Sequence, residues 1–103
     1  MRIRRAATAT LLATLTGLAP AQAARAASLY DFAGQGVIIW SEPRAGSTPV
    51  GLGHPGQGFE SDRSQEHEPY RCDLFDSTLW HHGRNVTTGV AGWVAACDLV
   101  DTD

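Results

Sequence analysis

The stretch that decides the fold is Thr88-Gly89-Val90-Ala91-Gly92-Trp93-Val94-Ala95-Ala96-Cys97-Asp98-Leu99, near the end of the 103-residue chain. Gly89 predicts a tight turn, and Trp93 with Val94 predicts the middle of a short strand. A last strand of this kind can close a small β-barrel, and Cys97 can tie it covalently to the rest of the chain.

The first 23 residues have the three-part pattern of a secretory signal peptide. A basic head is followed by an apolar run from Ala6 to Leu18 and by the small-residue site Ala21-Gln22-Ala23. The run is too short and too rich in threonine for a membrane-spanning helix, which needs about 20 mostly apolar residues. We expect cleavage after Ala23, or alternatively after Ala26, and therefore a secreted, extracellular protein that no longer contacts a membrane.

Cleavage leaves 80 residues, enough for one small domain. The basic count falls from 8 to 5 while all 11 acidic residues remain, so the net charge becomes −6 with neutral histidines. Nucleic-acid backbones and anionic membranes require a positive surface, so this charge argues against both as partners. We expect a leader over residues 24–35, one domain over residues 36–103, and a monomer.

The two cysteines, Cys72 and Cys97, are 25 positions apart in the mature part. An exported chain meets an oxidising compartment, so we expect them to form a disulfide. The loop it closes corresponds to about 3.5 kcal/mol of stabilisation in the chain-entropy model. A two-cysteine metal site is the alternative, but the close Cys-x-x-Cys spacing that such sites favour is absent.

Short β-favouring runs recur about every ten residues and are separated by glycine and proline. The runs are Val37–Trp40, Val50–Gly53, Phe59–Arg63 and Thr78–His82. Pro55-Gly56 fits a type II turn, and the charged segment Ser64–Pro69 is expected to be an exposed hairpin loop. No helical periodicity exceeds one turn, so the pattern predicts an all-β fold, a small barrel of about five short strands.

The order of these motifs resembles that of bacterial SH3-like domains. Val37-Ile38-Ile39-Trp40-Ser41-Glu42-Pro43 is similar to the family's opening strand, and Val50-Gly51 and Pro55-Gly56-Gln57 to the segments after it. Leu79–His82 and Gly89–Val94 look like its tryptophan strand and its closing Gly-Trp-Val, and the two cysteines look like those of secreted actinobacterial members. The likeness runs from Gly36 to Val100 and implies an SH3-like barrel that binds the cell wall. Trp40 stands where the family usually has arginine, so any role of that arginine is absent.

The residues give little support to an enzyme, and we expect neither a cofactor nor a metal. His81 and His82 are neighbours in a predicted strand, so their imidazoles point to opposite faces and cannot share one ion. His54 and His67 lie in separate predicted loops. No Gly-x-Ser-x-Gly elbow is present. The carboxylates between Glu60 and Glu68 are expected to form a solvated face, because so small a barrel has no deep cleft for a glycosidase pair.

The aromatic residues are the better indication of function. Eight large rings in 80 residues are more than a small barrel can bury, so we expect two or three to line a shallow groove. Trp93 and Phe59 are assigned to the core, and Trp40, Tyr70 and Trp80 to ligand binding. We expect a non-catalytic binding module for cell-wall peptide or glycan (peptidoglycan), or for an extracellular protein. The alternative is a small secreted inhibitor or interaction protein that presents the Ser41–Pro49 or Ser64–Pro69 loop to a protein partner.

Overall fold

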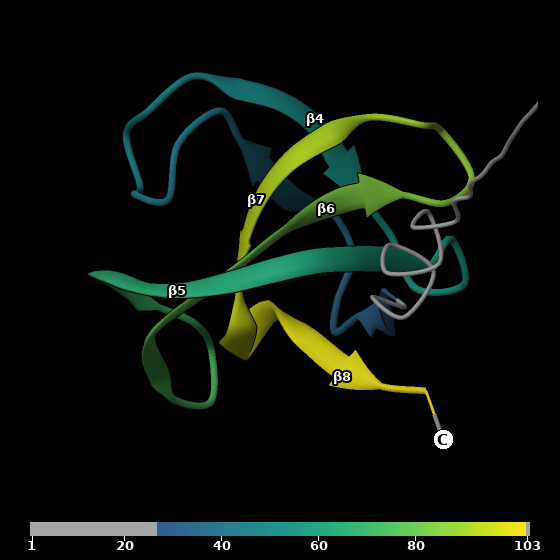
Figure 1. Ribbon diagram of the computed structural model, residues 1–103. Coiled ribbons are helices and arrows are strands. Elements are labelled where there is room, and N and C mark those ends of the chain that lie inside the picture. Colours follow the sequence, from purple (N-terminus) through teal and green to yellow (C-terminus); the bar gives the residue numbers. More distant parts are fainter. Residues whose placement is uncertain (1–26, 103) are drawn as a thin grey trace, which may run out of the picture.

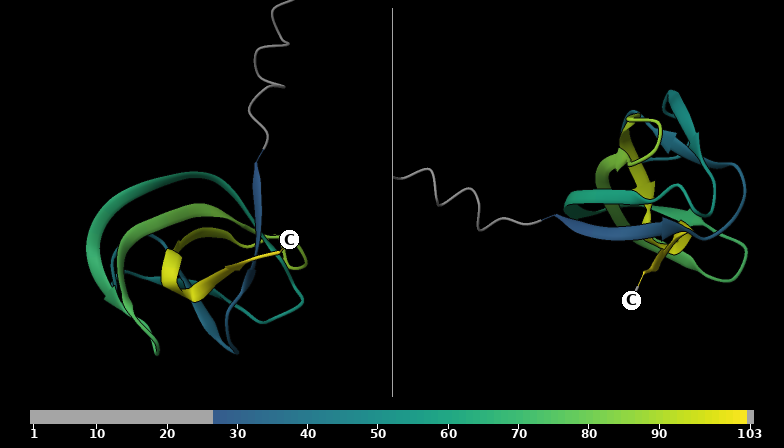
Figure 2. Two further views of the ribbon diagram at one scale, coloured as in Figure 1. Left: turned by 90° about the horizontal axis from the view of Figure 1, so that it is seen from below. Right: turned by 90° about the vertical axis from the view of Figure 1, so that its right-hand side faces the viewer.

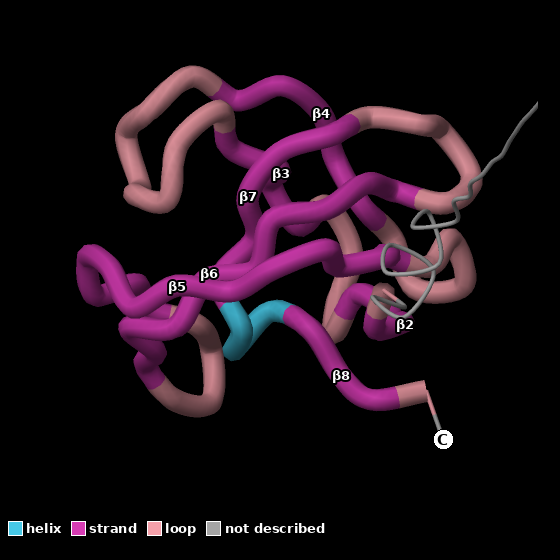
Figure 3. Tube along the Cα trace, viewed as in Figure 1, coloured by secondary structure: helices cyan, strands magenta, loops and turns pink. Residues whose placement is uncertain are grey.

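The computed structural model describes residues 27–102, which form one antiparallel sheet of seven strands and a single 3-10 turn (Figures 1 and 3). The strands are β2 (Ser28–Phe32), β3 (Val37–Trp40), β4 (Pro49–Gly53), β5 (Phe59–Arg71), β6 (Asp76–Asn85), β7 (Ala91–Ala95) and β8 (Leu99–Asp101), and the turn η2 is Ala96–Asp98. The prediction of an all-β fold is confirmed. The predicted signal peptide, residues 1–23, and its cleavage sites lie outside the described residues.

The strand order is β4-β3-β7-β6-β5-β2-β8, so the sheet has two end strands, β4 and β8. The stretch around Trp93 forms β7, which lies inside the sheet between β3 and β6 rather than at a closing seam. The expected closed barrel of about five strands is therefore wrong for residues 27–102. Two further strands are present, because Ser28–Phe32 and Leu99–Asp101 pair with each other, with Tyr30 opposite Asp101.

The sheet buries apolar side chains on both of its faces because successive residues of β3 and β7 point in opposite directions. One cluster packs Phe32, Val37, Ile39, Phe59, Val94 and Leu99. The other packs Trp40, Trp80, Trp93, Ala95 and Cys97. The assignment of Phe59 and Trp93 to the core is confirmed, with exposed fractions of 0% and 8%.

The two ends of the sheet are brought together by side chains instead of a strand ladder. A Cβ atom on Gly53, in the end strand β4, would overlap the buried ring of Phe32 in β2. The Asp31 carboxylate accepts hydrogen bonds from the backbone N–H groups of Gly56, at 2.9 and 3.0 Å, and Gly58, at 3.2 Å. We call this contact between β2 and the loop after β4 the Asp31 clamp. Asp31 and Phe32 lie in the segment assigned to a leader, so the folded unit extends at least to Ser28.

The β5–β6 hairpin is longer than predicted and curves around the rest of the sheet (Figure 2). Ser64–Pro69, expected to be a hairpin loop, belongs to β5, where Gln65 pairs with Trp80. The actual turn follows Cys72, whose N–H donates to the carbonyl of Phe75 at 3.2 Å. The loop prediction was wrong because pairing with β6 holds this polar segment extended despite its composition.

The predicted disulfide is confirmed, since Cys72 and Cys97 are bonded. It joins the end of β5 to η2. The backbone N–H of Ala33 also donates to the carbonyl of Asp98 at 2.8 Å, which ties η2 to the β2–β3 turn. These two connections fix three segments that are far apart in the chain around one cavity.

Candidate functional site: an acidic cavity at the disulfide

The largest hollow described is a cavity of about 390 Å³ where the β2–β3 turn, the end of β5 and η2 meet. Its lining combines backbone from Ala33 to Ile38 with Tyr70, Arg71, Cys72, Asp73, Leu74, Cys97 and Asp98. Gly36 has a φ of 69°, which a side chain would disfavour, and no atom lies within 4 Å of a Cβ built on Gly34. The glycines therefore leave peptide groups of this wall open to a ligand.

Two carboxylates and a phenol determine the electrostatics of the cavity. Burial raises the pKa of the half-buried Asp98 carboxyl, and the neighbouring charge of Asp73 raises this pKa further. Burial likewise raises the pKa of the Tyr70 phenol, with an added contribution from the charge of Asp98. A carboxylate whose ionised form is disfavoured by burial and by a like charge is stabilised by any cation that approaches it. The cavity therefore suits a positively charged group.

The three residues predicted to bind ligand are brought together, but only one reaches the cavity. The ring of Tyr70 packs edge to face on Trp40 and on Trp80, with centroid separations of 6.4 and 5.2 Å. Tyr70 lines the cavity. Trp80 is 0% exposed, and its indole N–H donates to the carbonyl of Glu68 at 2.8 Å. The assignment of Trp80 to ligand contact is corrected, because the curved hairpin covers it. Trp40, 9% exposed, supports Tyr70 from behind.

Asp98 and Asp73 were not among the predicted site residues. Each directly follows a cysteine, so a predicted Cys72–Cys97 disulfide already places the two aspartates on neighbouring segments. That was the available signal. Their partial burial depends on η2 and on the β2–β3 turn, which no local pattern indicates.

The adjacent histidines point to opposite faces of the sheet, as expected. His81 is 8% exposed, and its Nδ1 atom lies 3.1 Å from the Ser61 hydroxyl. His82 is half-buried, and its Nδ1 atom lies 3.0 Å from the Asp62 carboxylate. Within residues 27–102, no three His, Cys, Asp or Glu side chains gather closely enough to hold a metal ion.

The acidic residues of β5 lie on its exposed surface. The Glu60 carboxylate pairs with Arg84 at 3.1 Å, and that of Asp62 with Arg63 at 3.2 Å. Exposed pairs of this kind contribute little to stability. This part of β5 is a solvated face, as the sequence predicts.

Comparison of the chain with protein-family models, with curated proteins and with solved structures found no match. In residues 27–102, no helix has the length and apolar character needed to cross a membrane.

Proposed function

We propose that this protein is a secreted, non-catalytic binding module of the SH3-like type, and that its ligand is cell-wall peptidoglycan. The observation that carries the proposal is the acidic cavity, which offers Asp98, Asp73 and the Tyr70 phenol beside open backbone. Stem peptides of the wall supply the matching chemistry, because they combine an extended backbone with a free side-chain amine. The amine pairs with Asp98, and the peptide backbone lies against the Gly34–Gly36 wall.

A binding role fits the chemistry of the cavity better than catalysis. The cavity contains a pair of acidic side chains and a phenol, but no histidine and no free thiol line it. The resemblance to SH3-like domains supports the same class of function, since many such domains attach other proteins to the cell wall. The sheet of residues 27–102 differs from a closed barrel at its two ends, and this difference leaves the cavity intact.

The test is titration calorimetry of the exported protein with a soluble stem peptide carrying a free amine, and with the same peptide acetylated on that amine. Asp98→Asn should weaken binding of the free-amine peptide about tenfold, which is the effect of losing roughly 1.4 kcal/mol of ion pairing. The affinity should rise with pH through the raised pKa of Asp98, because binding requires its ionised form. Asp101→Asn, an exposed aspartate of β8 outside the cavity, is the matched control and should bind normally.

Equal affinity for the free and acetylated peptides would show that the cavity does not read the amine. Retention on purified peptidoglycan provides the second measurement. If the wild-type protein is not retained on the wall and Asp98→Asn changes nothing, the proposal is wrong.

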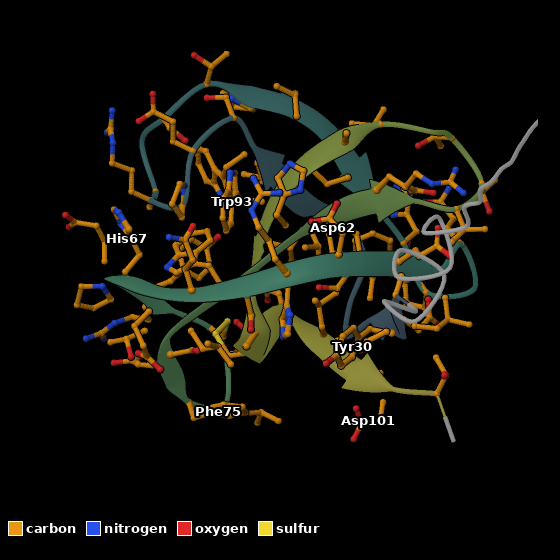
Figure 4. All side chains as sticks on the ribbon, viewed as in Figure 1. Tyr30, Asp62, His67, Phe75, Trp93 and Asp101 are labelled. Atoms are coloured by element: carbon orange, nitrogen blue, oxygen red, sulfur yellow. A yellow bond between two sulfur atoms is a disulfide. The ribbon has the colours of Figure 1, made fainter. Side chains whose placement is uncertain are left out.

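A second candidate function, a secreted protein that presents a loop to a protein partner, is favoured by the β5–β6 turn. Leu74 and Phe75 are 92% and 60% exposed there, and Phe75 extends from the turn in Figure 4. Cross-linking in culture supernatant should then give one stoichiometric complex that Phe75→Ser abolishes and Val100→Ser, on exposed β8, leaves intact. Wall retention without such a complex favours the first function.

A further inference from the structure

A second, smaller hollow of about 140 Å³ lies between β2, β5 and β6 and shares no lining residue with the acidic cavity. It has room for about four or five water molecules at their liquid volume, comparable with one sugar ring. The side chains available to it come from Ser28, Tyr30, Ser61, Ser64 and His81, and the chain at residues 62–63 completes the wall.

The strand register places these side chains on one face. Ser28 pairs with Ser61, and Ser64 pairs with His81. The register shifts between Ser61 and Arg63, which brings Ser61 and Ser64 to the same side of β5 although they are three positions apart. The face therefore carries a run of hydroxyl groups beside one imidazole.

The same shift turns the charged side chains of this segment to the other face. Asp62 bonds to His82 there, and the Arg63 guanidinium lies 5.2 Å from the centre of the Trp93 ring. Figure 4 shows Asp62 and Tyr30 on opposite sides of β5. The hollow is consequently polar but uncharged, which disfavours an ionic ligand.

One ring nitrogen of His81 has no partner among residues 27–102. The Ser61 hydroxyl donates to the carbonyl of Arg63 at 3.2 Å, so the hydrogen bond between Ser61 and His81 must be donated by Nδ1–H of the imidazole. This tautomer leaves Nε2 as an acceptor, and burial lowers the pKa of His81, which keeps the ring neutral. A buried acceptor without a donor is unfavourable by about 1–3 kcal/mol. An O–H or N–H group of a ligand can relieve this.

We propose that this hollow binds one neutral, hydroxyl-bearing sugar unit, with His81 Nε2 accepting a hydrogen bond from the sugar. Serine hydroxyls can both donate to and accept from sugar hydroxyls, and the Tyr30 ring, 4.7 Å from that of His81, offers an apolar surface. This inference rests on the proposed function and deepens it, since a wall ligand then has its peptide in the acidic cavity and its glycan in the second hollow.

The test is nuclear magnetic resonance of the exported protein, following the imidazole nitrogens during titration with N-acetylglucosamine and its β-1,4-linked tetramer. The expected result is a saturable shift of His81 Nε2, with little change at the exposed His67. Ser64→Leu fills the hollow from an exposed position and should weaken binding at least tenfold without unfolding the protein. His67→Gln, on the same strand, is the matched control and should bind normally.

The two proposals fail in different ways. If neither sugar shifts His81, or if Ser64→Leu binds as well as wild type, the sugar site is wrong even where the amine-bearing peptide still binds. Asp98→Asn should leave the sugar titration unchanged. Sugar binding that persists while the peptide shows no dependence on Asp98 would instead overturn the assignment of the acidic cavity.

Discussion

At the scale of single residues, the fold depends on a few polar contacts between segments that are distant in the chain. Asp31 shows this most directly. The pKa of its carboxyl is held below the ordinary value chiefly by the N–H of Gly56, against an opposing effect of burial, with further hydrogen bonds from Phe32 and Gly58. The clamp is therefore strongest when Asp31 is ionised.

Replacing the clamp should make stability less dependent on pH. A carboxyl whose pKa is lower in the folded state binds fewer protons when folded, so its stabilisation is complete above about pH 3.9 and is lost as the pH falls through the folded pKa. Asp31→Asn should lower the free energy of unfolding at pH 7 by about 1 kcal/mol, a modest value because the site is open to solvent. Urea titrations should show wild type and variant converging below pH 3, whereas Asp101→Asn should match wild type at both pH values.

Gly53 provides a purely steric test of how the sheet ends meet. A Cβ at this position would overlap the buried Phe32 ring, which has no free space into which to move. Gly53→Ala should reduce the free energy of unfolding by about 1–3 kcal/mol. Gly34→Ala, where no atom lies within 4 Å of the new Cβ, should change it by less than about 0.5 kcal/mol. Equal urea midpoints for the two variants would show that β4 does not pack on β2.

At the scale of elements, the disulfide holds the end of the curved hairpin against η2. Removing both sulfurs with Cys72→Ala and Cys97→Ala should cost about 3.5 kcal/mol, because the unfolded chain loses the constraint of a closed loop. The acidic cavity is bounded by the same two segments, so affinity for the amine-bearing peptide should fall under conditions where the variant is still folded. Circular dichroism establishes the folded fraction, and calorimetry then measures the binding. Unchanged affinity in a folded double variant would show that the hairpin end keeps its place without the bond.

Elements were predictable where local chemistry alone favours a strand. Val37–Trp40 is β-branched and aromatic, and it forms β3 with the predicted bounds. Ser64–Pro69 contains few β-favouring residues, and it becomes part of a 13-residue strand only because β6 supplies its partners. Trp80 was misassigned for the same reason, since its burial is produced by the curvature of the hairpin. The cysteine pair was predictable from compartment and number, whereas the roles of Asp31 and Asp98 depend on groups that are far away in sequence.

At the scale of the whole molecule, residues 27–102 form an open sheet rolled onto itself, with one face of each of its central strands in each core cluster. β2 is part of this unit, although the sequence assigns its residues to a leader. A chain beginning at Ala27 should therefore have the same urea midpoint as one beginning at Ala24. A chain beginning at Ala33 loses Asp31 and Phe32 and should be strongly destabilised. If the shortest chain unfolds at the same urea concentration, β2 is dispensable.

The pairing of the first described strand with the last has a practical consequence for tethering. β2 enters the sheet at Ser28, beside the point where β8 leaves it, while the far end of β2 leads into the wall of the acidic cavity. Attachments at either terminus therefore leave from one edge and point away from that wall. A biotin placed at either end should immobilise the protein on a sensor chip with its peptide affinity unchanged, and a fused cargo at either end should not obstruct the ligand.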